Sequence, residues 1–366
     1  MRALNVLLIT QEDYLAGSTF SVSYLAKGLQ QRGHKVVVVA RPDSLLQKQV
    51  AGTGVVFKPL VIRSRFDWKA IGQLKTIVLK FGIQIVNAQS SKDRYVSVLA
   101  RWVFRLPVLV IHTRRQVAQS IGGFLQYLFY VNGTDRIVAV SHGVKKSLVR
   151  KGIPQNHVQV IFNGTPREKY QLSQQVTENL KSKLKITASD VVVGCVSRRK
   201  NQEQLLLSLN YLSFPVTVIF VGIAEDDELR ALRKQLMLPH KLHYAGEVPG
   251  AEVLHYFKLF SCMVLCSVIE GLSQSLLEAM YLGVPVIATA AAGNLDLIEH
   301  QKNGLLYSDK DYAGLALQIQ SALNNPALRS TIISGGITTA SDTFSIDRTL
   351  QQYEEFYAHL LSSRQF

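Results

Sequence analysis

Short apolar runs alternate with amphipathic segments along the first part of the chain. The run "LNVLLIT" (4–10) predicts a buried strand, because a strand covered on both faces reads as a continuous apolar stretch. The segment "STFSVSYLAKGLQQRG" predicts a helix with Ser18 as its N-cap and Gly33 just past its end. Further strand-like runs are "HKVVVVA", "IQIVNA", "PVLVIHT" and "RIVAVS". This alternation predicts parallel strands joined by crossover helices.

The same alternation starts again after a polar stretch at residues 167–190. Its strand-like runs are "VVVGCVS", "VTVIFVG", "LHYAG", "CMVLCS" and "PVIAT", and an amphipathic helix, "FSIDRTLQQYEEFYAHLL", closes the chain. We therefore predict an α/β protein with two Rossmann-like domains, at 1–166 and 167–342, and a C-terminal helix at 343–366. In such domains ligands bind at the carboxyl ends of the strands, in the crevice between the halves.

Composition narrows the class of protein and its compartment. The 366 residues are 47% apolar and 18% charged, and no run of 18 or more apolar residues occurs, so we expect no transmembrane segment. Cys195, Cys262 and Cys266 are odd in number and lie in apolar runs, which indicates a reducing compartment. We therefore expect a cytoplasmic protein.

The net charge of +15 belongs entirely to the first half. Residues 1–166 hold 23 Lys and Arg against 6 Asp and Glu, whereas the remaining residues hold 18 against 20. Such a surplus favours an anionic partner, which could be a nucleic acid, an acidic lipid or a phosphorylated substrate. A surface that is merely basic is the alternative.

The stretch "SVIEGLSQSLLEAMYLGVP" (267–285) places two carboxylates in otherwise uncharged surroundings. It follows the strand "CMVLCS", so Glu270 lies in a loop at a strand's carboxyl end, where ligands bind. A helix is expected from about Ser275, ended by Gly283. Glu278 could cap that helix through a capping box with Ser275, or it could bind a ligand. Carboxylates accept hydrogen bonds from sugar hydroxyls, and the free amides of residues 272–275 suit a phosphate, so the loop fits a sugar joined to a pyrophosphate.

The glutamate pair, with "EGLSQSLLEAMYLGVPVIAT" around it and "AAGNLDLIEH" and "NGLLY" after it, resembles the signature of retaining glycosyltransferase family 4, of the kind that builds bacterial cell-surface glycans and lipopolysaccharide. The resemblance runs from end to end. It implies the GT-B fold, with an acceptor-binding first domain, a donor-binding second domain and a last helix that crosses back to the first. It also implies that Glu270 contacts the donor sugar and that Glu278 binds the ribose. The other donor-binding residues expected in this loop are Gly271, Leu272, Ser273, Gln274 and Ser275.

The basic loop "SRRKN" follows the strand "VVVGCVS" and suits a departing diphosphate, because Arg and Lys form charge-assisted hydrogen bonds with it. In the family an Arg and a Lys in this loop stabilise the leaving group. Lys200 matches the lysine, and the arginine is either Arg198 or Arg199. We place Lys200 and Arg198 among the catalytic residues and Arg199 among the donor-binding residues.

Two further positions in the first half resemble family site residues. Gly17, in "YLAGSTFS", matches a glycine-containing first loop that faces the donor phosphate and the acceptor. His112, at the end of "PVLVIHT", matches an active-site histidine, although Arg115 stands where that histidine often falls, and a structural role for His112 is the alternative. Asp309 and Asp311, in "SDKD", are interpreted as surface residues. The family works without a metal, so we expect neither a metal nor another cofactor.

The segment "RSRFDWKAIGQLKTIVLKFG" (63–82) combines Lys and Arg with Phe66 and Trp68. Such a segment suits an anionic membrane surface, and its apolar residues could equally form the core face of a crossover helix. We expect the protein to be peripheral on the inner face of the cytoplasmic membrane.

The expected activity is transfer of a sugar from a nucleotide sugar, taken to be a UDP-sugar, to a saccharide acceptor carried on a lipid. GDP and ADP donors, the sugar itself and the linkage stay open. The alternatives are a non-catalytic nucleic-acid- or membrane-binding protein and a nucleotide-sugar epimerase. No zinc spacing or aromatic RNA-binding motif supports nucleic-acid binding, so no nucleic-acid partner is expected.

Overall fold

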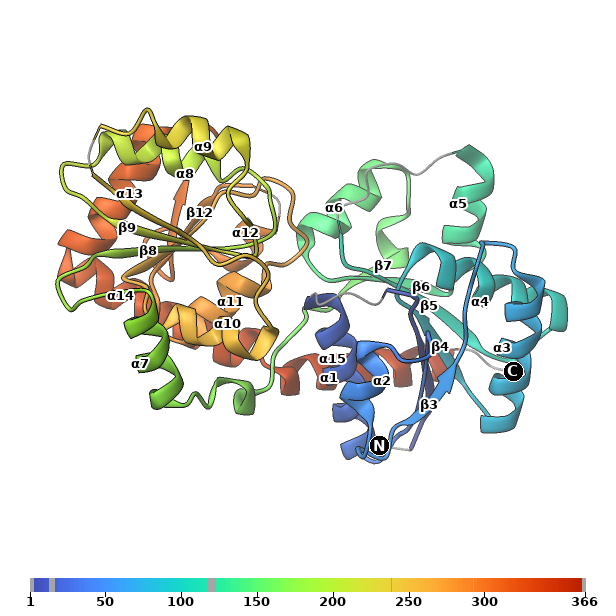
Figure 1. Ribbon diagram of the computed structural model, residues 1–366. Helices are drawn as coiled ribbons and strands as arrows, with labels where there is room; N and C mark the ends of the chain where they lie inside the picture. Colours follow the sequence, from blue (N-terminus) through green and yellow to red (C-terminus); the bar gives the residue numbers. More distant parts are fainter. Residues whose placement is uncertain (1–2, 13–16, 117–122, 238, 292, 364–366) are drawn as a thin grey trace. The chain divides into compact units, whose positions relative to one another are not determined.

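A computed structural model describes residues 3–363 except 13–16, 117–122, 238 and 292. The chain divides into two compact units (Figure 1). The first unit contains Met1–Pro166 together with Ser345–Phe366, and the second contains Arg167–Phe344. Each unit is a parallel sheet with helices on both faces, so the expected α/β class is confirmed.

The sheet of the first unit has seven strands in the order β3-β2-β1-β4-β5-β6-β7, all of them parallel. The strands are β1 (Asn5–Ile9), β2 (Lys35–Ala40), β3 (Val56–Pro59), β4 (Ile85–Ala88), β5 (Leu109–Arg114), β6 (Arg136–Ala139) and β7 (Val158–Val160). The strand order reverses between β1 and β4, and a crevice for a ligand forms at the carboxyl ends of strands at such a switch point.

Helices cover both faces of this sheet. They are α1 (Gly17–Gln31), α2 (Leu45–Val50), α3 (Trp68–Phe81), α4 (Ser91–Phe104), α5 (Gly123–Val131), α6 (His142–Arg150) and α15 (Ile346–Ser363). One core lies against α1 and α15, and the other against α3 and α4. The helix expected to start after Ser18 begins one residue before it, so Ser18 lies in the first turn of α1 and is not its N-cap.

The last helix packs on the first unit. In α15, Leu350, Tyr353 and Tyr357 are buried in the core that also contains α1, and a Cβ on Gly28 of α1 would overlap Leu350. The Glu354 carboxylate accepts hydrogen bonds from Arg32 at 2.7 Å and lies 2.9 Å from His34. This helix therefore completes the first unit, although the chain passes through the second unit before reaching it.

The sheet of the second unit has six parallel strands in the order β10-β9-β8-β11-β12-β13. The strands are β8 (Val192–Val196), β9 (Thr217–Val221), β10 (Lys241–Tyr244), β11 (Cys262–Leu265), β12 (Val286–Thr289) and β13 (Leu305–Tyr307). The helices are α7 (Gln174–Lys183), α8 (Glu203–Ser208), α9 (Asp227–Arg233), α10 (Gly250–Phe257), α11 (Gln274–Tyr281), α12 (Asn294–Leu297), α13 (Tyr312–Asn324) and α14 (Pro326–Thr338). The loops after β8 and β11 meet at the carboxyl edge of this sheet, because the two strands are neighbours.

Candidate active site

The neighbouring central strands β8 and β11 of the second sheet bring the predicted site residues Lys200 and Glu270 together. Glu270 lies in the loop after β11, and Lys200 lies in the loop after β8. Their side chains form an ion pair, Nζ to Oε1, and the exposed fractions are 14% for Glu270 and 27% for Lys200. Two of the predicted site residues thus share one place, even though 70 positions separate them in the sequence.

The helix after this loop begins earlier than the sequence indicated, and its cap is different. The N-cap of α11 is Ser273, whose hydroxyl accepts from the amide of Leu276 at 3.4 Å. The capping box of Ser275 with Glu278, one of the two alternatives for Glu278, is therefore wrong, because a cap at Ser273 places Leu276, and not an acid, at the third helical position. The helix ends at Tyr281, and Gly283 follows with a positive φ of 73°, as the sequence predicted.

Glu278 is used differently, as part of an ion pair with Lys169. Lys169 lies in the short 3-10 turn Arg167–Tyr170 at the start of the second unit, and the next residue, Tyr170, stacks on Tyr281 of α11 with ring centroids 3.9 Å apart. Sequence reasoning missed Lys169, since it lies in a polar stretch without periodicity. An aromatic residue next to a lysine just after the last strand of the first domain is the only signal that could have pointed to it.

The backbone of the glutamate loop is fixed by the turn after β12. Gly293 donates its amide to the carbonyl of Glu270 at 3.3 Å, and a Cβ on Gly293 would overlap the carbonyl oxygen of Gly271. Asn294 donates from Nδ2 to the carbonyl of Ser267 at 3.1 Å and to that of Thr289 at 3.0 Å. This explains why a glycine-containing turn follows the glutamate pair in the sequence.

The remaining predicted donor-binding residues surround the start of α11. Gly271 and Ser273 are buried, while Leu272, Gln274 and Ser275 are half-buried. The amide nitrogen Nε2 of Gln274 has no hydrogen-bond partner within the described part of the chain. A donor amide is therefore available next to the helix N-terminus.

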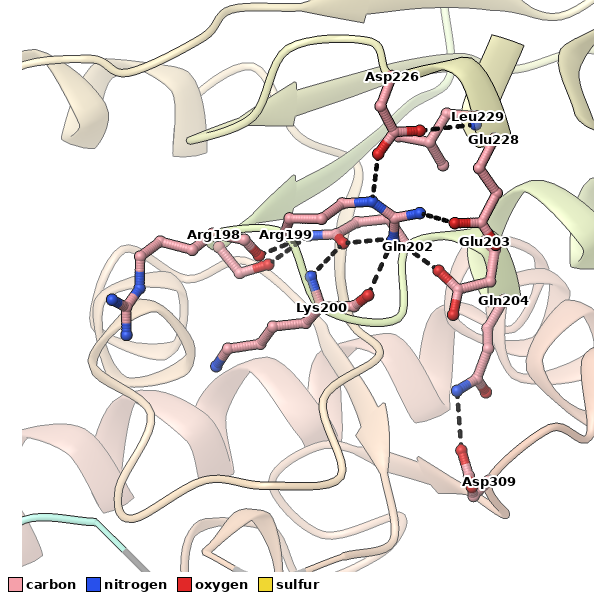
Figure 2. A network of polar contacts seen from close by, with 11 residues as sticks. Arg198, Arg199, Lys200, Gln202, Glu203, Gln204, Asp226, Glu228, Leu229 and Asp309 are labelled. Atoms are coloured by element: carbon pink, nitrogen blue, oxygen red, sulfur yellow. Dashed lines mark hydrogen bonds and ion pairs between the residues drawn. The ribbon is translucent and has the colours of Figure 1, made fainter. Parts of the chain in front are cut away.

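The basic loop after β8 separates its two arginines (Figure 2). The guanidinium of Arg199 is bound by three carboxylates, those of Asp226 at 2.6 Å, Glu203 at 2.7 Å and Glu228 at 2.6 Å. Arg198 is exposed and extends away from this network, as Figure 2 shows. Of the two arginines, Arg198 is the one whose charge no carboxylate in the described residues neutralises.

Electrostatics and hydrogen bonds hold this loop in shape. Burial alone would lower the pKa of Arg199, but its hydrogen bonds to Glu203 and Asp226 outweigh burial and raise that pKa. The pKa of Asp226 is lowered, first by the amide of Leu229 and then by Arg199. The buried Gln202 accepts from the amide of Lys200 at 2.7 Å and donates to the carbonyl of Arg198 at 2.8 Å. Arg199 and Gln202 thus set the loop conformation. The side chain of Lys200 takes no part in these contacts and pairs with Glu270 instead.

The two site residues predicted in the first unit lie at the carboxyl edge of the first sheet. Gly17 is the first residue of α1, and residues 13–16 of its loop lie outside the described residues. His112 is not at the end of its strand as expected, since β5 continues to Arg114. Its ring is fully buried, with Nδ1 3.1 Å from the carbonyl of Ala88, and burial lowers the pKa of His112 well below the usual value. Arg115, the alternative, donates to the side-chain oxygen of Gln89 at 2.6 Å.

Within the described residues no group of three or more His, Cys, Asp or Glu side chains could hold a metal ion. Asp309 accepts from Gln204 at 2.8 Å, and Asp311 is the N-cap of α13. These two aspartates therefore have structural partners. In the same part of the chain, no helix has the length and apolar character needed to cross a bilayer.

This geometry is that of a glycosyltransferase with the GT-B fold, and comparison with known families agrees. The family described as "Glycosyl transferases group 1" matches residues 175–338, and the one described as "Glycosyltransferase Family 4" matches residues 16–169. The chain belongs to glycosyltransferase family 4, as the glutamate signature indicated.

Relatives in this family build different cell-surface glycans. The chain is 23% identical over 291 residues to the Staphylococcus aureus capsular polysaccharide biosynthesis glycosyltransferase CapM. The aligned region covers 75% of this chain and 76% of CapM. The chain is 27% identical over 191 residues to the lipopolysaccharide 1,6-galactosyltransferase of Escherichia coli K12, covering 50% and 51% of the two chains. Among solved structures, Anabaena HepE in complex with UDP-glucose superposes with a TM-score of 0.82 at 22% identity, covering 99% of this chain and 100% of HepE. The superposition establishes the fold.

Proposed function

We propose that the protein transfers a sugar from a UDP-sugar to a saccharide acceptor carried on a lipid, with retention of the anomeric configuration. The observation that carries this proposal is the ion pair of Lys200 with Glu270 at the carboxyl edge of the second sheet, beside the N-terminus of α11. A hydroxyl-binding acid and a phosphate-binding cation at one place suit a sugar diphosphate.

Donor binding would replace this ion pair by ligand contacts. The sugar hydroxyls would donate to the Glu270 carboxylate, while Lys200 would turn to the diphosphate together with Arg198. The free amides at the start of α11 and the Gln274 amide group would add donors to the phosphate oxygens. Because the two partners neutralise each other before the donor arrives, neither leaves an unpaired charge in a half-buried site.

In the transition state negative charge develops on the leaving phosphate and positive charge at the anomeric carbon. Lys200 and Arg198 would stabilise the first, and Glu270 would hold the sugar in position. These cations would do the electrostatic work for which other transferases use a metal, so the reaction is expected to need none. Glu278 would bind the ribose hydroxyls in place of Lys169. UDP is favoured as the nucleotide because HepE binds UDP-glucose and UDP in crystal structures.

The acceptor side of the proposal rests on charge and exposed aromatic groups. The first unit carries the entire positive surplus of the chain. Its helices α3 and α4 expose Trp68 to 63% and Trp102 to 38%, and Lys75 lies 4.5 Å from the ring centroid of Phe104. Aromatic side chains among lysines favour an anionic membrane surface, so we place the protein on the inner face of the cytoplasmic membrane with a lipid-linked acceptor.

The test is release of UDP from UDP-sugars in the presence of membranes. Wild type should release UDP only when an acceptor is present, and Glu270→Gln should be slower by roughly 10²–10³-fold, the effect of removing one preorganised polar contact. Glu299→Gln is the matched control, because Glu299 forms an exposed ion pair with Lys302 outside the site. Full activity of Glu270→Gln, or the absence of acceptor-dependent release with every nucleotide sugar, would overturn the proposal. Product NMR would report the anomeric configuration.

A further inference from the structure

The first unit contains a cation that nothing in the described structure neutralises. Arg94, in the first turns of α4, is fully buried, and its Nε, Nη1 and Nη2 atoms have no hydrogen-bond partner within the described residues. Its guanidinium carbon lies 3.6 Å from the ring centroid of Tyr130 and 5.1 Å from that of Tyr95. Stacking on two aromatic rings stabilises a guanidinium, but it leaves all five N–H donors unused.

No acid in the described part of the chain forms an ion pair with Arg94. The adjacent Asp93 is also buried, yet no ion pair joins the two side chains, and the Asp93 oxygens likewise lack a hydrogen-bond partner among the residues described. Consecutive helical residues point in different directions, which explains why they do not meet. A buried unpaired charge costs several kcal/mol. A buried charge that destabilises the fold by this much indicates a function other than stability, such as ligand binding.

His112 supplies the complementary chemistry next to this cation. Its ring lies 5.7 Å from that of Tyr130, on which Arg94 also stacks. Because Nδ1 donates to the carbonyl of Ala88, the neutral ring presents the lone pair of Nε2, and this atom has no partner in the described part of the chain. Burial and the charge of Arg94 hold the pKa of His112 low, so Nε2 is an acceptor at neutral pH.

The position of these groups is one where ligands bind. Arg94 follows β4 at the start of α4, and His112 lies near the end of the neighbouring β5. Ser91, three residues before Arg94 and so on the same side of α4, has a hydroxyl that also lacks a partner within the described ranges. The strand order reverses between β1 and β4, immediately beside this place.

We propose that Arg94 and His112 form an acceptor subsite for an acidic saccharide. The guanidinium pairs with a phosphate or carboxylate group of the acceptor, and Nε2 of His112 accepts a hydrogen bond from a neighbouring hydroxyl. A guanidinium fork matches two oxygens of either oxyanion. The inference rests on the proposed function, since it names the chemical class of the acceptor. It assigns the anionic group to the first unit, whereas the donor diphosphate belongs to Lys200 and Arg198 in the second.

The binding test needs no donor and no transfer. Thermal unfolding and calorimetric titration of the full chain would be followed with inorganic phosphate, glucuronate and neutral glucose at constant ionic strength. Phosphate and glucuronate distinguish the two oxyanions, and glucose is the blank. We expect at least one of the two anions to bind wild type at least about tenfold more tightly than Arg94→Met, the size expected of a charge-assisted pair. Arg41→Met, which removes an exposed arginine of the same unit, should bind like wild type.

The variants also separate a binding role from a structural one. Without ligand, Arg94→Met should unfold at the same temperature as wild type or higher, because it removes an unpaired buried charge and keeps the aliphatic stem. Arg94→Lys keeps the charge but loses the fork, so its affinity should lie between the two. His112→Phe should reduce binding of glucuronate more than binding of phosphate, since glucuronate carries sugar hydroxyls beside its acid group and inorganic phosphate has no hydroxyl outside the oxyanion itself.

Three results of the binding and stability measurements would overturn the inference. They are equal anion affinity in wild type and Arg94→Met, an Arg94→Met protein that is less stable by several degrees, and loss of the Arg94-dependent binding when UDP saturates the protein. The last would place the anion in the donor site. If no nucleotide sugar reacts but the Arg94-dependent binding persists, the subsite stands and the proposed function falls. If Arg94→Met transfers sugar to acidic acceptors with unchanged kcat/KM, the subsite falls and the proposed function stands.

Discussion

The two units differ in how the cations at the carboxyl edges of their sheets are paired with acids. In the second unit each named cation near the glutamates except Arg198 has an acid partner, as Lys200 has Glu270 and Lys169 has Glu278. In the first unit Arg94 is buried with no partner among the described residues, and the sequence carries a large positive surplus. A balanced site can be assembled before its ligand arrives. A site with an unpaired buried cation needs a ligand to neutralise that positive charge, so its ligand should be anionic.

Within this comparison the largest effect should come from Arg198, the cation near the glutamates that has no acid partner among the described residues. Arg198→Met should lower kcat by roughly 10²-fold, the loss expected for one charge-stabilising contact, without a change in unfolding temperature. Arg199→Met should instead lower stability by about 1 kcal/mol, since its three carboxylates are partly solvated, and should affect kcat less. UDP release and thermal unfolding of both variants measure these two effects. A stable but inactive Arg199→Met beside an active Arg198→Met would reverse the roles given to the two arginines.

A smaller effect is expected from the buried acid of the first unit. Burial raises the pKa of Asp93 to about 7. The folded state therefore binds a proton that the unfolded state has released between about pH 4 and pH 7, and stability falls as the pH rises through this window. Asp93→Asn should abolish this fall and gain roughly 2 kcal/mol at pH 8. Urea unfolding at pH 5 and pH 8 measures it.

Asp67 provides the matched control on the neighbouring helix. It is the N-cap of α3, and the amides of Arg63 and Ala70 lower the pKa of Asp67. Its contribution is present above the unfolded pKa and is lost as the pH falls, which is the opposite sign to Asp93. Asp67→Ala should cost about 1 kcal/mol at pH 8, the value of an N-cap. Equal pH profiles for the two variants would contradict the contrast between them.

The smallest effect concerns the membrane surface of the first unit. Lys75→Gln and Trp68→Ser should each weaken binding to vesicles containing anionic lipid by about 1 kcal/mol, close to fivefold in partition. Binding to neutral vesicles should be weak for all proteins, and added salt should reduce binding of wild type. Tyr211, exposed to 56% in the second unit, gives the control Tyr211→Ser. Unchanged binding in both variants would remove α3 from the proposed surface.

Sequence patterns predicted the central strands of both sheets and the edge strand β10, and they missed the edge strands β3, β7 and β13. A polar residue interrupts the apolar residues of β3 and of β7, and β13 has only three residues, so none of the three forms a long apolar run. Glu270 and Lys200 were predictable because each lies in a loop after an apolar run, and Glu278 because its spacing from Glu270 resembles the family signature. Their donor-binding roles stay predictions.

The contacts that the sequence did not reveal depend on tertiary structure. The partners of Arg199 include Asp226 and Glu228, which lie at the start of α9, and Lys169 reaches Glu278 across more than one hundred positions. Arg94 looks like an exposed helical residue in a polar first turn, and its burial against Tyr130 of α5 and Tyr95 of its own helix appears only in the structure. Periodicity reports which face of a helix is apolar, and it cannot report a charge that is buried for binding.

The position of α15 sets the order in which the nascent chain can finish folding. All residues of the second unit, from Arg167 to Phe344, leave the ribosome before the helix that the first unit needs to cover β1 and β2. The later half can therefore mature while the earlier half still exposes its apolar sheet, reversing the usual vectorial order. A stop codon near position 345 would yield an intact second unit joined to a first unit that chaperones and proteases recognise as unfinished.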